Sequence, residues 1–296
     1  MRTSRIKGVV AAVVTPVRSD LEPDIERFIA YCRLLLNNGC NGLNICGTTG
    51  EATSFTLAQR MRIMDAAAAA LPLERLMVGT GAAAVGDAET LTRHASTLGF
   101  AAALVLPPFY YKGVDETGLV RYIGRLAAAT TVQEIDIFLY NFPAMTGIVY
   151  TPHLVARLCA EFGERIAGLK DSSGDLSYAR EIAALPGALS VFPSNEAVLL
   201  DARAGTFAGC ISASANINAA YCGAAFRDGD EAALETATKL RALVSRQPLI
   251  PSIKALVAHQ QADADFCRMV PPLTELAPEV HQQLLADADA LAAESA

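Results

Sequence analysis

The sequence predicts an α/β protein, a closed (β/α)8 TIM barrel followed by a C-terminal helical extension. Short β-branched runs alternate with amphipathic helices, which is the pattern of parallel strands joined by helical crossovers. Eight such runs occur, and their ends lie roughly 20 to 34 residues apart, the length of one strand and one helix. A closed barrel accommodates eight units in about 225 residues better than an open doubly wound sheet does.

Each predicted strand is a short apolar stretch. In order, the eight stretches are Gly8–Thr15, Gly42–Cys46, Leu76–Thr80, Ala102–Leu106, Ile135–Tyr140, Ile166–Lys170, Leu189–Phe192 and Gly209–Ser212. The helices between them show a helical period, as in the apolar stripe from Ile25 to Leu36, which stops at Gly39. Beyond Asp228 only helical stripes remain. We therefore assign residues 1–228 to the barrel and residues 229–296 to the helical extension.

The composition excludes several classes of protein. Apolar residues make up 52% of the chain and charged residues 19%, which excludes a disordered or fibrous protein. The net charge of -7 leaves no basic surface for nucleic acid. No charge-free apolar run approaches the roughly 18 residues that cross a bilayer. We expect neither nucleic acid nor a membrane as a partner.

The cysteines and histidines argue against disulfides and metals. The seven cysteines are odd in number and stand mostly inside apolar segments, which favours reduced core thiols. No Cys-x-x-Cys occurs and the four histidines lack metal-ligand spacing, so no metal site is expected. Residues Met1–Val14 resemble a short signal peptide but lead into Thr15-Pro16 without a small-x-small cleavage site. We therefore expect a cytoplasmic protein.

Lys170 ends the sixth predicted strand. In barrels of this kind, reactive groups lie at the C-terminal ends of the strands and in the loops that follow. Among the five lysines, Lys170 alone holds such a position. An apolar barrel mouth hydrates an ammonium poorly, so the neutral amine can attack a ketone and form a Schiff base. The alternative is a structural lysine that pairs with Asp171 or Asp175.

Two further strand ends carry polar groups. Tyr140 ends the fifth strand, where it either passes protons or is a packed aromatic residue with a satisfied hydroxyl. The second strand leads into the turn Gly47–Glu51, whose backbone N–H groups and two hydroxyls, those of Thr48 and Thr49, suit a carboxylate. The alternative is a helix entry that the threonines merely cap.

Two other segments have the pattern of phosphate sites. Gly79-x-Gly81-x-x-Ala84 has the spacing of a dinucleotide fingerprint, but the acidic residue expected about 20 residues later is missing. Gly209–Ser212 lies where barrels often hold phosphate, yet it contains no basic residue. We therefore expect no nucleotide cofactor, and a phosphorylated substrate is unsupported.

Five segments carry a resemblance to a known family. They are Gly47-Thr48-Thr49-Gly50-Glu51, Pro108-Phe109-Tyr110-Tyr111, Tyr140-Asn141-Phe142-Pro143, Gly168-Leu169-Lys170-Asp171 and Gly209-Cys210-Ile211-Ser212. In order and spacing they resemble the dihydrodipicolinate synthase / N-acetylneuraminate lyase family of Schiff-base aldolases. The match runs from Gly8 to about Asn218, and the helical tail matches as well.

The resemblance implies a role for each matching residue. Lys170 would form an imine with pyruvate or another 2-oxo acid, and Tyr140 would shuttle protons. Thr48 and Thr49 would fix the carboxylate, and Thr48 would also link Tyr140 to Tyr110.

The same resemblance implies an oligomer. In this family the residue matching Tyr110 comes from a neighbouring subunit, so we expect a homodimer or a homotetramer. Ile211 would place its backbone carbonyl beside the bound pyruvate. The partners would be pyruvate and an aldehyde, and no metal or organic cofactor is needed.

Two positions depart from the synthase pattern. Met145 stands where dihydrodipicolinate synthases carry an arginine that binds the carboxylate of the aldehyde, and methionine cannot make that bidentate contact. Ser194 stands where the synthases usually have glycine. We expect Ser194 and Glu196 to hydrogen-bond the hydroxyls of a sugar acid, although a capped helix start explains them equally well.

We therefore expect a pyruvate-dependent class I aldolase that cleaves or makes a 2-keto-3-deoxy sugar acid, rather than a true dihydrodipicolinate synthase. A dehydratase of a keto-deoxy sugar diacid, or a deaminase, would use the same imine at Lys170. A third hypothesis is a non-catalytic regulator that binds 2-oxo acids. The lysine, the tyrosines and both threonines occur together, which weighs against that regulator.

Overall fold

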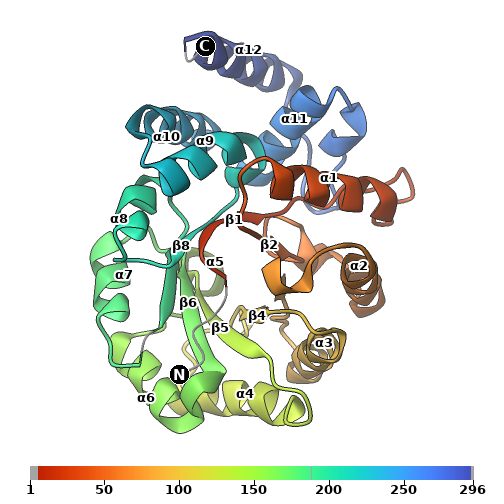
Figure 1. The fold of residues 1–296 in the computed structure, drawn as a ribbon. Helices are drawn as coiled ribbons and strands as arrows, with labels where there is room; N and C mark the ends of the chain where they lie inside the picture. The colour runs from red at the N-terminus through yellow and green to blue at the C-terminus, as the bar shows by residue number, and fades with distance from the viewer. Residues whose placement is uncertain (1–5, 188, 295–296) are drawn as a thin grey trace.

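The computed structural model describes residues 6–187 and 189–294 and contains a barrel of alternating strands and helices (Figure 1). Eight parallel strands are ordered β7-β6-β5-β4-β3-β2-β1-β8. They span Gly8–Ala12 (β1), Gly42–Ile45 (β2), Leu76–Gly79 (β3), Ala102–Val105 (β4), Asp136–Asn141 (β5), Ile166–Asp171 (β6), Ser190–Pro193 (β7) and Gly209–Ser212 (β8). Next to β8, the Ala208 N–H donates to the Val191 carbonyl of β7 at 2.9 Å. This bond joins the two ends of the sheet, and the predicted barrel is confirmed.

Most of the helices surround the barrel, whereas the short α5 lies at its mouth, as Figure 1 shows. Through the barrel they span Ile25–Asn37 (α1), Leu57–Ala70 (α2), Val85–Leu98 (α3), Glu116–Ala129 (α4), Pro143–Thr146 (α5), Pro152–Phe162 (α6), Leu176–Ala183 (α7), Leu199–Arg203 (α8) and Ala215–Asp228 (α9). Local sequence sets several of their starts. Thr56 and Gln59 form a capping box on α2, and the Thr151 side chain caps α6, which begins at Pro152.

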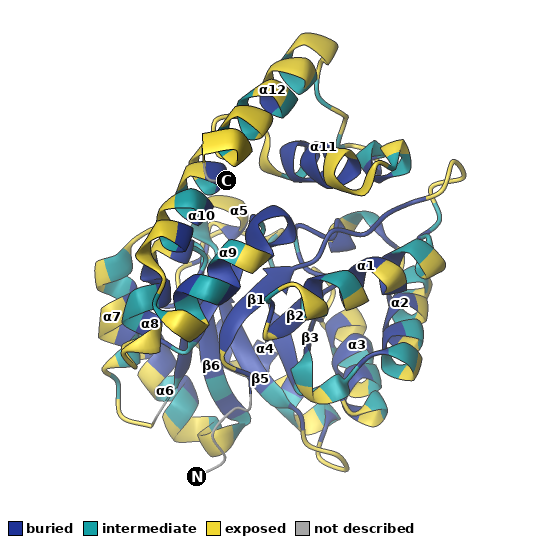
Figure 2. Cartoon of the chain, turned by 45° about the horizontal axis from the view of Figure 1, so that its top comes forward, coloured by how far each residue is buried: buried dark blue, intermediate teal, exposed yellow. Residues whose placement is uncertain are grey.

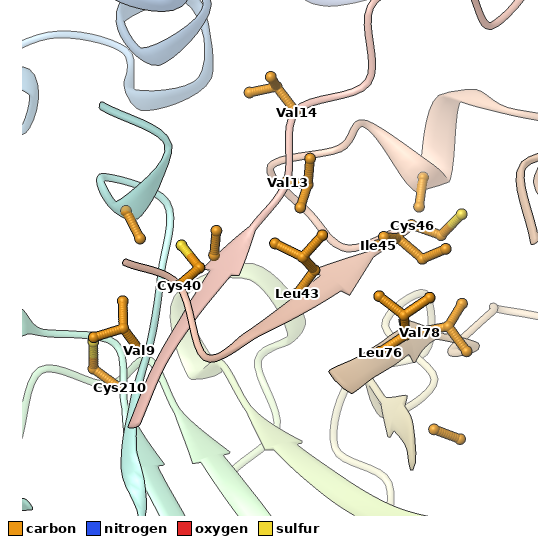
Figure 3. Packing of buried hydrophobic residues seen from close by; sticks show 14 of the residues in the cluster. Val9, Val13, Val14, Cys40, Leu43, Ile45, Cys46, Leu76, Val78 and Cys210 are labelled. Atoms are coloured by element: carbon orange, nitrogen blue, oxygen red, sulfur yellow. The ribbon is translucent and has the colours of Figure 1, made fainter. Parts of the chain in front are cut away.

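The strands bury side chains on both faces, because helices cover the outside and other side chains fill the inside. Val9 and Leu43 belong to the large outer core, and Figure 3 shows them among the packed side chains of neighbouring strands. Val10, Phe138 and Phe192 belong to a second cluster, which fills the barrel interior. Because successive side chains point to opposite faces of a strand, every second residue points into the barrel, and only those residues can face the barrel mouth.

Gly168 is the small residue that this inner packing requires. A Cβ at Gly168 would lie 2.3 Å from the ring of Phe138. That ring lies 6.0 Å from the ring of Phe192 across β6. Lys170 follows two residues later on the same face of β6, so it stands above a floor of aromatic rings.

Three further helices follow α9, namely α10 (Glu231–Val244), α11 (Leu249–Gln261) and α12 (Pro278–Glu294). Helix α11 is mostly buried, whereas Leu284 is the only buried residue in the described part of α12 (Figure 2). None of the helices in residues 6–187 and 189–294 is both long and apolar enough to cross a membrane.

A buried ion pair fixes α11 to the barrel. The Lys254 ammonium donates to Glu51 Oε1 at 2.5 Å, and both side chains are fully buried. Lys254 also donates to the carbonyls of Thr15 and Arg268, at 3.2 and 2.6 Å. The second oxygen of Glu51 accepts the Val270 N–H at 2.8 Å. Burial lowers the pKa of the Lys254 ammonium, and the Glu51 carboxylate opposes that shift.

All seven cysteines are free, and five of them are buried. Burial raises the pKa of the Cys40 thiol to about 12 and that of Cys46 to about 11. These thiols therefore remain protonated at neutral pH and behave as small apolar side chains.

The Lys254–Glu51 pair yields a stability prediction. Lys254→Met leaves the Glu51 carboxylate buried without its cation, so we expect a loss of about 3–5 kcal/mol in the free energy of unfolding. The double variant Glu51→Gln with Lys254→Met removes both charges and should recover a large part of that loss. Urea unfolding of the three proteins measures the difference, and a double variant no more stable than Lys254→Met would contradict the role of the buried charge.

Candidate active site

A cavity of about 750 Å³ opens at the C-terminal end of the barrel. Its barrel side is formed by Thr48, Thr49, Tyr140, Phe142, Met145, Lys170, Ser172, Ser194, Ile211 and Ala213. Its other side comes from the extension, through Arg241, residues 247–251, residues 272–277 and Val280. A volume in this range is typical of small-molecule sites, and the C-terminal face is where TIM barrels place them.

Lys170 and Tyr140 lie side by side in this cavity. They are register partners on the adjacent strands β5 and β6. Each is only 4% exposed. The Lys170 Nζ lies 4.2 Å from the centroid of the Tyr140 ring, within cation–π range. Tyr140 also stacks on Phe142, and its hydroxyl accepts a long hydrogen bond of 3.5 Å from Ser172 Oγ.

The carboxylates next to Lys170 are engaged elsewhere. Asp171 accepts hydrogen bonds from the Asn141 amide at 2.8 Å and from the hydroxyl of Ser173 at 2.8 Å. Asp175 caps α7 through the backbone N–H groups of Ser177 and Tyr178. Among the described residues Lys170 makes no salt bridge within 4.0 Å. The alternative in which Asp171 or Asp175 pairs with Lys170 is therefore not found.

The turn after β2 presents Thr48 and Thr49 to the cavity. Two non-glycine residues with left-handed backbones flank it, Cys46 at φ 50° and Glu51 at φ 55°. Such conformations cost energy and persist where surrounding contacts enforce them. At Glu51 the surrounding contacts include the buried pair with Lys254 and the Val270 N–H, so the extension contacts the end of the turn that carries the threonines.

The remaining predicted residues fall into two groups. Ile211, at the end of β8, and Ser194, after β7, both line the cavity. Tyr110 is 74% exposed and lies outside the cavity of this single chain. Its loop is attached to α5, because the Lys112 ammonium donates to the carbonyls of Phe109 and Thr146 at 2.7 and 2.9 Å.

Glu196 lies beneath the cavity rather than in its wall. Its side chain is fully buried, and its carboxylate accepts hydrogen bonds from Ser212 at 2.7 Å and from Ser214 at 2.5 Å. Its other oxygen lies 3.0 Å from Nη1 of Arg241. The expected direct contact with substrate hydroxyls is thus replaced by a contact with an arginine that does line the cavity.

Arg241 was not predicted. It lies on α10, 45 residues after Glu196, and the residues around it show only the apolar period of a surface helix. Its side chain is 29% exposed. Only the three-dimensional structure identifies Arg241, because it shows that Glu196 is fully buried, and a fully buried glutamate requires a cation partner.

No group of three or more histidine, cysteine, aspartate or glutamate side chains suited to a metal occurs in the described parts of the chain. The polar side chains of the cavity include a buried lysine, several hydroxyls, an arginine, Gln247 and the exposed Glu275. These groups suit covalent chemistry on an acid with a keto group.

Comparison with known proteins agrees with this geometry. The sequence model of the dihydrodipicolinate synthetase family matches residues 5–291. The chain belongs to this family. It is 34% identical over 255 residues to a DapA-like lyase of Chloroflexus aurantiacus, covering 84% of this chain and 85% of the relative.

Solved structures of the dihydrodipicolinate synthetase family share the whole fold. Dihydrodipicolinate synthase from Agrobacterium tumefaciens superposes with a TM-score of 0.90 at 30% identity, covering 97% of this chain and 99% of that one. YagE, a prophage protein from E. coli crystallised with pyruvate, gives 0.86 at 26% identity, covering 97% and 99%. Membership of this family makes the protein an enzyme of the lyase class.

Met145 lines the cavity and is 59% exposed, so the position where the synthases carry arginine holds no charge here. Family membership therefore establishes the lyase framework and leaves the second substrate to be inferred from the other charged groups of the cavity.

The Asn141–Asp171 hydrogen bond beside the lysine yields a pH-dependent prediction. Burial raises the pKa of Asp171, and the hydrogen bonds from Asn141 and Ser173 oppose the shift. Asn141→Asp replaces a donor by a second carboxyl, so the folded state should bind a proton more tightly than the unfolded state. The lost hydrogen bond alone should lower the free energy of unfolding by roughly 1–3 kcal/mol. In addition, the free energy of unfolding should fall further as the pH rises above the ordinary carboxyl range.

Thermal unfolding between pH 4.5 and pH 8 tests this prediction. The matched control Asn141→Ala removes the donor without adding a charge, so its loss of stability should depend much less on pH. Parallel pH curves for the two variants would contradict the like-charge interpretation.

Proposed function

We propose that this lyase is a class I aldolase that binds pyruvate as an imine on Lys170. The observation that carries the proposal is a buried lysine without an anionic partner, held against Tyr140 at the floor of a large cavity. The amine of such a lysine, in its unprotonated form, is the nucleophile that attacks a ketone. The joint presence of lysine, tyrosine and threonines favours an enzyme over a silent binder of 2-oxo acids.

Imine formation needs an anchored substrate and a proton carrier. The Lys170 amine adds to the keto carbon of pyruvate, and the resulting carbinolamine loses water. Thr48 and Thr49 hold the carboxylate, so that the keto carbon faces Nζ. Tyr140 supplies the proton that leaves with the hydroxyl, and the backbone carbonyl of Ile211 lies beside the bound pyruvate.

Carbon–carbon chemistry follows from the electrophilic imine. In cleavage, the C4 hydroxyl of the 2-keto-3-deoxy acid gives its proton to the Tyr140 phenolate, and the C3–C4 electron pair moves into the protonated imine. The aldehyde leaves and an enamine of pyruvate remains on Lys170. Protonation at C3 and addition of water then release pyruvate and the free amine. In synthesis the same steps run in reverse.

The cavity is far larger than pyruvate alone requires, so it has room for the aldehyde half of a longer acid. We propose a 2-keto-3-deoxy acid as the substrate class. Loss of water or ammonia from a related acid would use the same imine and would leave the carbon chain intact.

Tyr110 is proposed to reach the active site of a second copy of this chain. In one chain Tyr110 and Tyr111 are 74% and 70% exposed, which is unusual for two adjacent aromatic rings. Their position in a loop tied to α5 places them beside the barrel mouth rather than within their own cavity. A homodimer or homotetramer would cover them.

The proposal predicts a covalent adduct on Lys170. Pyruvate with borohydride should inactivate the enzyme and leave a reduced pyruvate adduct on the Lys170 peptide, located by mass spectrometry. Lys170→Ala should show no adduct. Tyr140→Phe should still be trapped in part, although its turnover should fall by orders of magnitude through loss of proton transfer.

An unmodified Lys170 in the wild-type protein would reject the proposal. Product analysis with 2-keto-3-deoxy acids then separates the reactions that share an imine. An aldolase releases pyruvate and an aldehyde, whereas a dehydratase or a deaminase yields a product with every carbon retained.

The intersubunit role of Tyr110 predicts complementation between inactive variants. In mixed dimers of Lys170→Ala and Tyr110→Phe chains, one site of each heterodimer combines an intact lysine with an intact tyrosine. Random mixing should therefore restore about a quarter of the wild-type sites. A mixture no more active than the separate variants would show that Tyr110 does not act across the interface.

A further inference from the structure

The charged residues of the cavity wall differ in what they are free to bind. Within the described chain these residues are Lys170, Arg241 and Glu275. Lys170 is used by the proposed imine, and Glu275 is exposed to solvent, which screens its charge. Arg241 is therefore the cation that remains for a second anionic group.

Arg241 is held by groups below the cavity. Its Nη1 lies 3.0 Å from Glu196 and also donates to the hydroxyls of Ser212 and Ser214, at 3.3 and 3.4 Å. Glu196 begins the short 3-10 helix after β7, and the serines lie at and just beyond the end of β8. Three groups, one from the 3-10 helix and two from the end of β8 and the residues after it, thus fix one end of the guanidinium.

The other end of the guanidinium is unused. Nε and Nη2 of Arg241 have no hydrogen-bond partner among the described residues. This edge of an arginine matches the two oxygens of a carboxylate. Because Glu196 already fixes the side chain, binding an acid there costs little additional conformational entropy.

The net charge of this region favours an anion of single charge. The Arg241 charge is partly balanced by the buried Glu196, and the cavity wall adds the exposed Glu275. A phosphate ester carries nearly two negative charges at neutral pH and would lack a second cation. The rest of the extension wall is largely apolar, with Leu249, Ile250 and Leu276 among its residues.

We infer that Arg241 is a specificity-determining residue that binds a carboxylate at the far end of the aldehyde half. The inference rests on the proposed imine chemistry and deepens it by naming the second substrate as an acidic aldehyde. The acid is then held on the β8 side of the mouth by a residue of the C-terminal extension, rather than beside α5 where Met145 stands.

The test uses 2-oxo acids that form the imine at Lys170 and extend toward Arg241. 2-Oxoadipate and 2-oxohexanoate have the same chain length, and only the first ends in a carboxylate. Trapping with cyanoborohydride, followed by mass spectrometry, gives the half-saturating concentration of each. We expect 2-oxoadipate to saturate the wild-type enzyme at roughly ten- to hundredfold lower concentration.

Variants of Arg241 separate recognition from folding. Arg241→Ala should abolish the preference for 2-oxoadipate, and Arg241→Lys should retain part of it. The double variant Glu196→Gln with Arg241→Gln leaves no unpaired buried charge, so it should fold and should also lack the preference. Pyruvate should still be trapped on Lys170 in all three proteins, because pyruvate has no second carboxylate for Arg241 to bind.

The outcomes distinguish this inference from the proposed function. If pyruvate is trapped but the wild-type enzyme does not prefer 2-oxoadipate, or the double variant keeps that preference, the role of Arg241 is rejected and the imine stands. Tighter trapping of 2-oxo-5-phosphonopentanoate than of 2-oxoadipate would reject the carboxylate. If pyruvate is not trapped, the proposed function fails, and the inference fails with it.

Discussion

The candidate active site depends on the alternation of side chains between the two faces of each parallel strand, both of which are buried. One set of side chains packs under the helices, and the alternate set fills the barrel, so a polar group fits only where a strand leaves the core. Tyr140 and Lys170 occupy the last inward positions of β5 and β6. Their proximity is therefore fixed by strand register, which loop motion does not alter, and Gly168 provides the space for the aromatic floor beneath them.

The second determinant of the site is the buried contact between the barrel and the extension. Lys254 of α11 binds Glu51, which ends the turn that carries Thr48 and Thr49. One ion pair thus positions both the turn proposed to hold the carboxylate and the helices that close the cavity. Because both charges are buried, the pair stabilises a specific placement of α11 more than it stabilises the chain as a whole.

Much of the fold and of the floor of the site could be predicted from sequence, because both follow from local periodicity. The apolar runs predict strands that end at Tyr140 and Lys170, one residue before the observed ends of β5 and β6. The family resemblance points to Ile211, and a departure from the synthase pattern points to Ser194. The sequence does not predict what the Glu196 side chain binds, because a polar residue at a helix start has the same local pattern whether its side chain faces substrate or a buried cation. Its partner Arg241 lies in a different helix, so only the packing of α10 against the short helix after β7 reveals it.

The proposed role of Arg241, together with Met145 at the position where the synthases carry arginine, suggests how one barrel could accept different second substrates. The imine proposed on Lys170 would activate the same carbon in every case, so the residues around the path to that carbon would select the second substrate. A cation after β5 and a cation from α10 would hold an acid on different sides of the mouth. The reacting aldehyde carbon would then present a different face to the enamine. With Met145 at the first position and Arg241 built on Glu196 at the second, the proposed binding mode would change the orientation of the aldehyde as well as its affinity. The stereochemical outcome would then depend on the C-terminal extension rather than on the barrel loops.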